Sequence, residues 1–273
     1  PAIVGAPGHI YTATTRIIDF VHLGTERGLT DATTLAVFLM VIANVILYCS
    51  TFLLRGKQYI TMSGKSTRPV IIDLGRWRIP LTCFVILFTV IVIIIPFASV
   101  MATSVTVNMG KPFTFSNMSL KAWSKIFHRA SILQSMKNSF VSAFTAASAG
   151  MIISCTMAYL LERTRVKGRR IPDFLITIGS GTPSVVIALA LIITMSGKFG
   201  INIYNTLSIM IIAYMIKYML MGMRPVVSAM GQVHSSLEEA AQISGAGWLR
   251  MLKDVSIPLI GASVVAGFFL IFM

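Results

Sequence analysis

The sequence has few charged residues and very few acids. Only 12% of its 273 residues are charged, and nine Asp and Glu residues stand against 23 Lys and Arg. Hydrophobic residues make up 55% of the chain. This composition excludes an ordinary soluble domain, in which about a quarter of the residues are charged, and is typical of a protein that spans a membrane.

Three signatures of chemistry are also missing. Cys49, Cys83 and Cys155 lie within apolar runs, which predicts packing residues rather than a disulfide framework. Residues 64–66, Gly-Lys-Ser, resemble the end of a phosphate-binding loop, but Tyr59 stands where that loop needs its first glycine. The four histidines have no carboxylate or cysteine at ligand spacing. The sequence therefore predicts neither an ATP site nor a preformed metal site in this chain.

Long apolar runs are what the chain has instead. A bilayer core about 30 Å thick needs about 20 apolar residues per helix, so such runs predict an all-α, polytopic bundle of transmembrane helices. Six spans are predicted, at residues 33–54, 79–101, 138–161, 173–196, 206–223 and 259–273. Because the last run is short and the chain starts with Pro1, we expect a fragment that stops inside its final helix.

Basic residues gather in two of the loops between these runs. Loop 55–78 has six Lys and Arg against one Asp, and loop 162–172 has five against one Glu. The positive-inside rule predicts that both loops are cytoplasmic, and by parity that residues 1–32, 102–137 and 197–205 lie outside.

The predicted external loop 102–137 is basic as well, which the rule does not explain. Its segment SLKAWSKIFHRASILQSM has the apolar spacing of an amphipathic helix. We therefore expect a helix at the membrane interface within this loop.

Residues 235–258 form a polar island between the fifth and sixth runs. Ser235 and Ser236 each precede a glutamate by three residues, which predicts a capped helix start. Gly245 and Gly247 then predict a turn, and the apolar spacing after them predicts a second short helix. Such a hairpin makes a rigid projection on which a soluble partner could act, and a loop resting on the membrane surface is the alternative.

The spacing of the island resembles a known motif. It has Glu-Ala-Ala, three residues, Gly, nine residues and Val-x-Ile-Pro, which is similar to the EAA motif of binding-protein-dependent ABC transporter permeases. The resemblance implies a permease of the type I ABC importer kind, whose island is the coupling helix on the ATPase subunit. The coupling residues that it implies are Glu238, Glu239, Ala240, Ala241, Gly245, Val255, Ile257 and Pro258.

More of the chain resembles the fused two-half ferric iron permeases of the FbpB type. Residues 1–79 resemble the tail of a first half, with an external segment, one span and a basic cytoplasmic linker, and residues 80–273 resemble a second half truncated at its C-terminus. The resemblance implies multi-pass location in a bacterial inner membrane and import of iron. It also implies a dimer of ABC ATPase subunits that binds ATP and Mg, an extracytoplasmic solute-binding protein and the other permease half as partners.

Other solutes and other classes of protein stay open. Related permeases carry phosphonate, sulfate or polyamine, and an ion channel would work without ATP. An intramembrane enzyme would need paired acids or a serine with a base inside the spans. Asp173, at the edge of one run, is the only acid within them.

Two features inside the runs predict a translocation path. Thr182, Pro183 and Ser184 interrupt the fourth run, and we expect a bend there that lines the path, with packing of small residues as the alternative. Lys217 lies inside the fifth run, where an ionisable residue marks a functional site by default. It precedes Arg224 by seven residues, so its amine could instead reach the cytoplasmic interface. A cation on the path would repel bare ferric ion, although an iron chelate or a counter-anion changes that argument.

Overall fold

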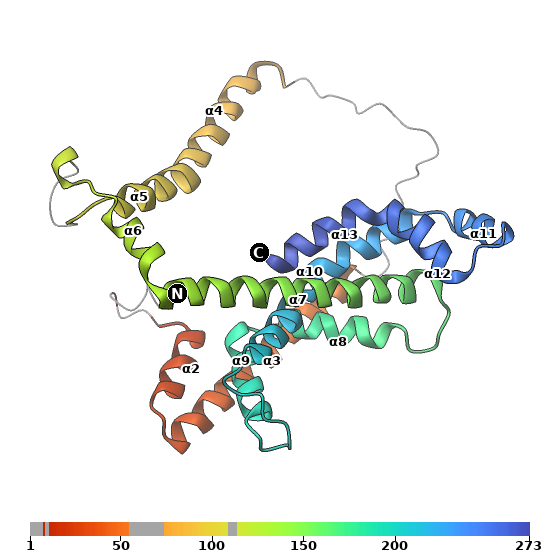
Figure 1. Ribbon diagram of the computed structural model, residues 1–273, viewed down its shortest axis with the longest axis horizontal. Coiled ribbons are helices and arrows are strands. Elements are labelled where there is room, and N and C mark those ends of the chain that lie inside the picture. Colours follow the sequence, from red (N-terminus) through yellow and green to blue (C-terminus); the bar gives the residue numbers. More distant parts are fainter. Residues whose placement is uncertain (1–7, 9–10, 55–73, 109–113) are drawn as a thin grey trace. The chain divides into compact units, whose positions relative to one another are not determined.

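The computed structural model describes residue 8 and residues 11–54, 74–108 and 114–273 (Figure 1). The predictions about most of the basic linker and about residues 64–66 lie outside the described residues. Where the chain is described, it consists of helices and turns with two isolated β-bridges and no strand, which confirms the all-α prediction.

The chain divides into two compact units, residues 1–57 with 138–273 and residues 58–137. This grouping differs from the predicted division at residue 79, which concerns homologous halves and stays a prediction. Five helices of the described residues are long and apolar enough to cross a membrane, and one bent pair makes a sixth if it is a single span. The six predicted spans correspond to these elements.

Three long helices build the core of the first unit. They are α7 (Ala130–Arg163), of which residues 138–163 belong to this unit, α10 (Leu207–Gln232) and α13 (Ile257–Phe272), and α10 and α13 lie side by side (Figure 1). A Cβ atom on Gly267 of α13 would lie 2.7 Å from the carbonyl oxygen of Gly222 on α10. Because no real Cβ tolerates that distance, the close contact of α10 with α13 depends on glycine at this crossing.

The fourth predicted run forms a broken pair of helices rather than one straight helix. These are α8 (Arg170–Gly181) and α9 (Ser184–Met195), which meet at an angle of 109°. The backbone of Thr182 is extended, with ψ of 137°, because the ring of Pro183 excludes the helical conformation from the residue before it. The bend at residues 182–184 is thus present, while its place on a translocation path stays a prediction.

Two N-terminal helices pack against the second half of this broken pair. α2 (Ala13–His22) is followed by α3 (Glu26–Leu54), which contains the first predicted span. Their buried residues and those of α9 form one apolar cluster, Ile17, Ala32, Ala36, Val186 and Leu189. Residues near the start of the chain thus help to hold α9.

The second helix of the predicted hairpin is not a separate helix. α11 (Ser235–Ile243) is a separate helix, but α12 (Trp248–Met251) continues through a π turn at Leu252–Ser256 into α13. Within that turn the N–H of Ile257 bonds to the carbonyl of Leu252. Pro258 has no N–H to donate, and the widened turn before it lets the helix continue without a break. The last apolar stretch therefore runs over Trp248–Phe272 and begins before residue 259.

The second unit contains α4 (Arg78–Thr89), a π turn at Val90–Ile94, α5 (Ile95–Ser104) and α6 (Lys121–His128). The amphipathic helix predicted for residues 119–136 is shorter than expected. Arg129 has an extended backbone, with φ of −93° and ψ of 110°, which ends α6. The residues that follow belong to α7.

Candidate functional site

The start of α11 differs from the predicted capping box. Neither serine caps the helix; His234 is the capping residue, and its Nδ1 accepts a hydrogen bond of 3.3 Å from the N–H of Ser236. Both serines already lie in the first turn, so the glutamates are free of any capping role. Their side chains are used in two different ways.

Glu238 is buried, with 6% of its surface exposed, and both of its oxygens are bonded. Its Oε2 accepts a hydrogen bond of 2.8 Å from Nε of Arg163, and its Oε1 accepts one of 2.9 Å from the hydroxyl of Ser256. Arg163 is the last residue of α7, and Ser256 ends the π turn before α13. We call Arg163, Glu238 and Ser256 the Glu238 clamp.

The clamp fixes the position of α11. Arg163 also donates a hydrogen bond of 2.7 Å from Nη2 to the carbonyl of Val233, just before α11. A buried ion pair is stable only when its remaining hydrogen-bonding groups are satisfied, as they are for this carboxylate. The clamp therefore joins the start of α11 to the end of α7 and to the turn that leads into α13.

The turn after α11 is closed by the hydrogen bonds of a Schellman motif. The N–H of Ala246 bonds to the carbonyl of Ala241 at 3.0 Å, and the N–H of Gly245 bonds to that of Gln242 at 2.9 Å. Gly245 has φ of +84°, as the predicted left-handed turn requires.

Three residues of the motif come together beside this turn. Ala241, Gly245 and Val255 line a hollow of about 320 Å³ between α11 and the helix that follows. Glu239 and Ala240 are exposed on α11. Ile257 and Pro258, which the motif also includes, lie in the first turn of α13 and do not line the hollow.

The hairpin also exposes large apolar side chains. Ile243 is 88% exposed and Leu249 is 74% exposed. Trp248 is held in place, because its Nε1 donates a hydrogen bond of 2.9 Å to the hydroxyl of Tyr159 and the two rings pack edge to face. A rigid base thus carries apolar residues and an acid outward, as a protein-docking surface does.

The second predicted site is the bend between α8 and α9. Lys217, in the middle part of α10, donates hydrogen bonds of 2.9 Å from Nζ to the carbonyls of both Ser180 and Thr182. The hydroxyl of Ser180 in turn donates one of 2.9 Å to the carbonyl of Lys217. The amine is therefore directed at the bend, where it satisfies carbonyls that the break in the helix leaves without an N–H partner.

Arg224, further along α10, has a different partner. Its Nη2 lies 3.2 Å from Oδ1 of Asp173 and 3.1 Å from the hydroxyl of Thr177, both on α8. Asp173, the only acid within the predicted spans, is therefore part of an ion pair between helices.

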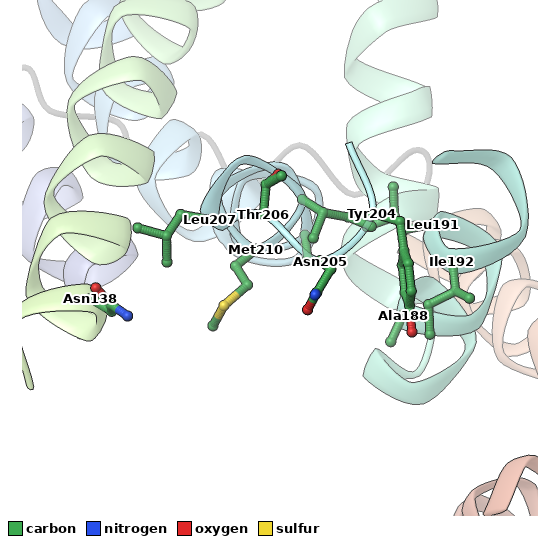
Figure 2. Close-up of a pocket in the computed structure, with 11 residues that line it drawn as sticks. Asn138, Ala188, Leu191, Ile192, Tyr204, Asn205, Thr206, Leu207 and Met210 are labelled. Carbon is green, nitrogen blue, oxygen red and sulfur yellow. The ribbon is translucent and has the colours of Figure 1, made fainter. Parts of the chain in front are cut away.

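A pocket of about 480 Å³ is lined by residues of α9 and α10. It is lined by the start of α10 and the loop before it, by α9 and by Asn138 of α7, and Figure 2 shows these side chains around it. Most of the lining is apolar, with polar groups from Asn138, Tyr204, Asn205 and Thr206. Nothing in the sequence had indicated this pocket.

Sequence reasoning also missed Arg163, Ser256 and Tyr159. Arg163 is 75 residues from Glu238, and a single Arg at the end of an apolar run is explained by topology alone. Charge complementarity between this Arg and one of the two glutamates is the only signal that the sequence offers. Among the described residues, no group of three or more His, Cys, Asp or Glu could hold a metal ion.

Comparisons with known proteins agree with the motif. Residues 150–273 match the sequence model of a family described as binding-protein-dependent transport system inner membrane component. The chain is 24% identical over 253 residues to the putative ferric transport system permease protein FbpB 1 of Haemophilus influenzae, covering 91% of this chain and 39% of that protein.

Two further relatives extend the comparison. The ferric transport system permease protein FbpB of Actinobacillus pleuropneumoniae is 24% identical over 253 residues, which cover 91% of this chain and 36% of the relative. The putative ABC transporter permease protein ORF1 of Streptomyces antibioticus is 25% identical over 129 residues, or 47% of this chain and 55% of the relative. The chain thus spans well under two thirds of each relative that it matches.

Proposed function

We propose that this chain, whose residues 150–273 match the family of inner membrane components of binding-protein-dependent transport systems, is a permease subunit of an ATP-driven importer. Its hairpin would be the contact for the ATPase. The chain would carry out no covalent chemistry, and ATP and Mg would bind to the partner.

One observation carries this proposal, namely the contrast between the two neighbouring glutamates. Glu238 is buried in the clamp, whereas Glu239 is exposed on the same helix. A surface that must transmit force needs an outward contact and a rigid attachment to the moving helices. The hairpin has both, and the attachment reaches α7 and α13.

The bend between α8 and α9 would lie on the translocation path. Thr182, Pro183, Ser184 and Lys217 would line this path, and closure of two ATPase subunits on coupling helices would switch it between outward and inward access. The lipid bilayer, a second permease half and an extracytoplasmic solute-binding protein would complete the assembly in a bacterial inner membrane.

Iron is the solute that we propose, on the names of two relatives at 24% identity. The test is ATP-dependent uptake of labelled ferric iron in cells that carry the complete permease, its ATPase and its binding protein. Gly245→Asp should abolish uptake, because a charged side chain at φ of +84° distorts the docking turn at a cost of roughly 1–2 kcal/mol.

Gly24→Asp is the matched control. Gly24 also has a positive φ, +63°, with open space around it, but it lies between α2 and α3, far from the hairpin in sequence. It should retain uptake and normal insertion. Normal uptake by Gly245→Asp would remove the coupling role, whereas absence of iron uptake in the parent would redirect the search to phosphonate, sulfate or polyamine.

A further inference from the structure

Lys217 has hydrogen-bonding capacity left over at the bend. An ammonium group has three N–H donors, and two of them are used by the carbonyls of Ser180 and Thr182. None of the ion pairs among the described residues includes Lys217, whereas Arg224 on the same helix is matched by Asp173. The bend therefore holds a positive charge that uses two of its three donors and has no carboxylate partner in the part of the chain that the structure describes.

On both helices that line the pocket, the lining residues come within one turn of Lys217 or of the bend. On α10 the lining residue Ala213 precedes Lys217 by four residues, which places the two on one face about one turn apart. On α9 the lining residue Ala188 follows Ser184 by four residues, so this wall also continues to the bend. By this spacing Lys217 lies on the face of α10 that lines the pocket with Met210 and Ala213, one turn beyond the lining residues.

The polar groups available suit one class of solute. A bare ferric ion is a hard cation that needs oxygen ligands of negative charge. The lining of the pocket has no acid, and the nearest fixed charge along its α10 wall is positive. An oxyanion would gain a charge-assisted hydrogen bond from the ammonium.

We propose that Lys217 binds the solute through an oxyanion group, so that the permease carries phosphate-, phosphonate- or carboxylate-bearing solutes and carries iron only as an anionic chelate. This proposal rests on the proposed import function and narrows its substrate. Two sources of the oxyanion are compatible with the same site, a ferric chelate and an iron-free phosphate or phosphonate.

The rival explanation is that Lys217 is only a structural cap on the carbonyls of the bend. Direct binding separates the two. We would measure equilibrium binding of labelled citrate, labelled citrate with equimolar ferric ion, and labelled inorganic phosphate to the purified complete permease with its ATPase subunits, without ATP.

Wild type should bind at least one of these probes saturably. Lys217→Met should weaken that binding about 30-fold or more, and Lys217→Arg should keep most of it. Binding of citrate only with iron would indicate a ferric chelate, and binding of inorganic phosphate would indicate an iron-free phosphate or phosphonate. Absence of saturable binding of all three probes, or equal binding by Lys217→Met, would overturn the proposal.

A second variant keeps the proposal testable if Lys217→Met fails to fold. Ala213→Asp places a carboxylate one turn from Lys217, where it should pair with the ammonium, leave the cap in place and abolish anion binding. Ser208→Asp is the control, because it lies nine residues before Lys217 and thus on the opposite face of α10. Equal binding by wild type and Ala213→Asp would also contradict the proposal.

The binding assay is independent of the uptake assay. Gly245→Asp should lose uptake but keep anion binding, because its change lies in the docking turn. If anion binding does not depend on Lys217 while uptake is intact, only the oxyanion site is refuted. If anion binding is intact and Gly245→Asp does not change uptake, only the coupling role is refuted.

Discussion

At the scale of single residues, adjacent glutamates have separate functions. Glu238 and Glu239 both fit the predicted start of a helix, and the sequence gives no reason to distinguish them. The structure buries Glu238 between Arg163 and Ser256 and leaves Glu239 exposed. The difference arises because successive residues on a helix point about 100° apart, so only one of the two can face α7 and α13.

Glu238→Gln tests the clamp. Removing the charge leaves the buried guanidinium of Arg163 without its counter-ion, so we expect a loss of about 3 kcal/mol in stability. The measurement is thermal unfolding of the purified complete permease in detergent. Glu239→Gln, on the exposed side of the same turn, should change stability by less than about 0.5 kcal/mol. Equal melting temperatures for the two variants would contradict the clamp.

At the scale of helices, glycine determines how closely α10 and α13 pack. Each of Gly222 and Gly267 lies against the backbone of the other helix. In a membrane the contact between helices depends on close packing rather than on the hydrophobic effect. Small residues at this crossing therefore contribute directly to the association of the last two long helices of the chain.

Gly267→Leu should separate these helices. Its side chain would collide with the carbonyl of Gly222 and with the Met151 side chain, which gives an expected loss of about 1–3 kcal/mol. Gly261→Leu on the same helix is the control, because nothing lies within 4 Å of a Cβ at that position. Thermal unfolding and the monodisperse yield in detergent would measure the effect. A Gly267→Leu protein as stable as Gly261→Leu would show that the crossing tolerates separation.

At the scale of the whole molecule, the N-terminal helices belong to the same compact unit as the C-terminal part. Ala36 of α3 is buried, with 3% exposure, in the cluster that includes Val186 and Leu189 of α9. The predicted first-half segment thus supports the helix that follows the bend. This contact joins residues about 150 positions apart, a separation over which periodicity carries no information.

Ala36→Trp tests this arrangement. A large ring cannot fit at a buried alanine, so we expect overpacking to cost about 1–3 kcal/mol. Val37→Trp is the matched control, since the neighbouring side chain is 54% exposed on the other side of α3 and should accept the ring. In thermal unfolding, the melting temperature of Ala36→Trp should be well below that of Val37→Trp. The reverse order would contradict the packing of α3 against α9.

The helices of this fold could largely be predicted, while the networks between them could not. Apolar runs predict the positions of the spans because burial in lipid requires about 20 apolar residues wherever the helix packs. The bend at Pro183 is also local, since the proline ring restricts the residue before it. The direct entry of α12 into α13 was missed, because Pro258 suggested a boundary and the π turn that bypasses it has no clear sequence pattern.

The sequence by itself determined that this is a helical membrane protein, and it correctly predicted a bend at Thr182–Ser184 and a turn at Gly245. These features follow from local properties, namely hydrophobicity, the proline ring and left-handed glycine. Only the tertiary structure decided that Glu238 joins Arg163 and Ser256 and that Lys217 faces the bend. Those contacts join helices distant in sequence, and their partners are set by how the helices pack.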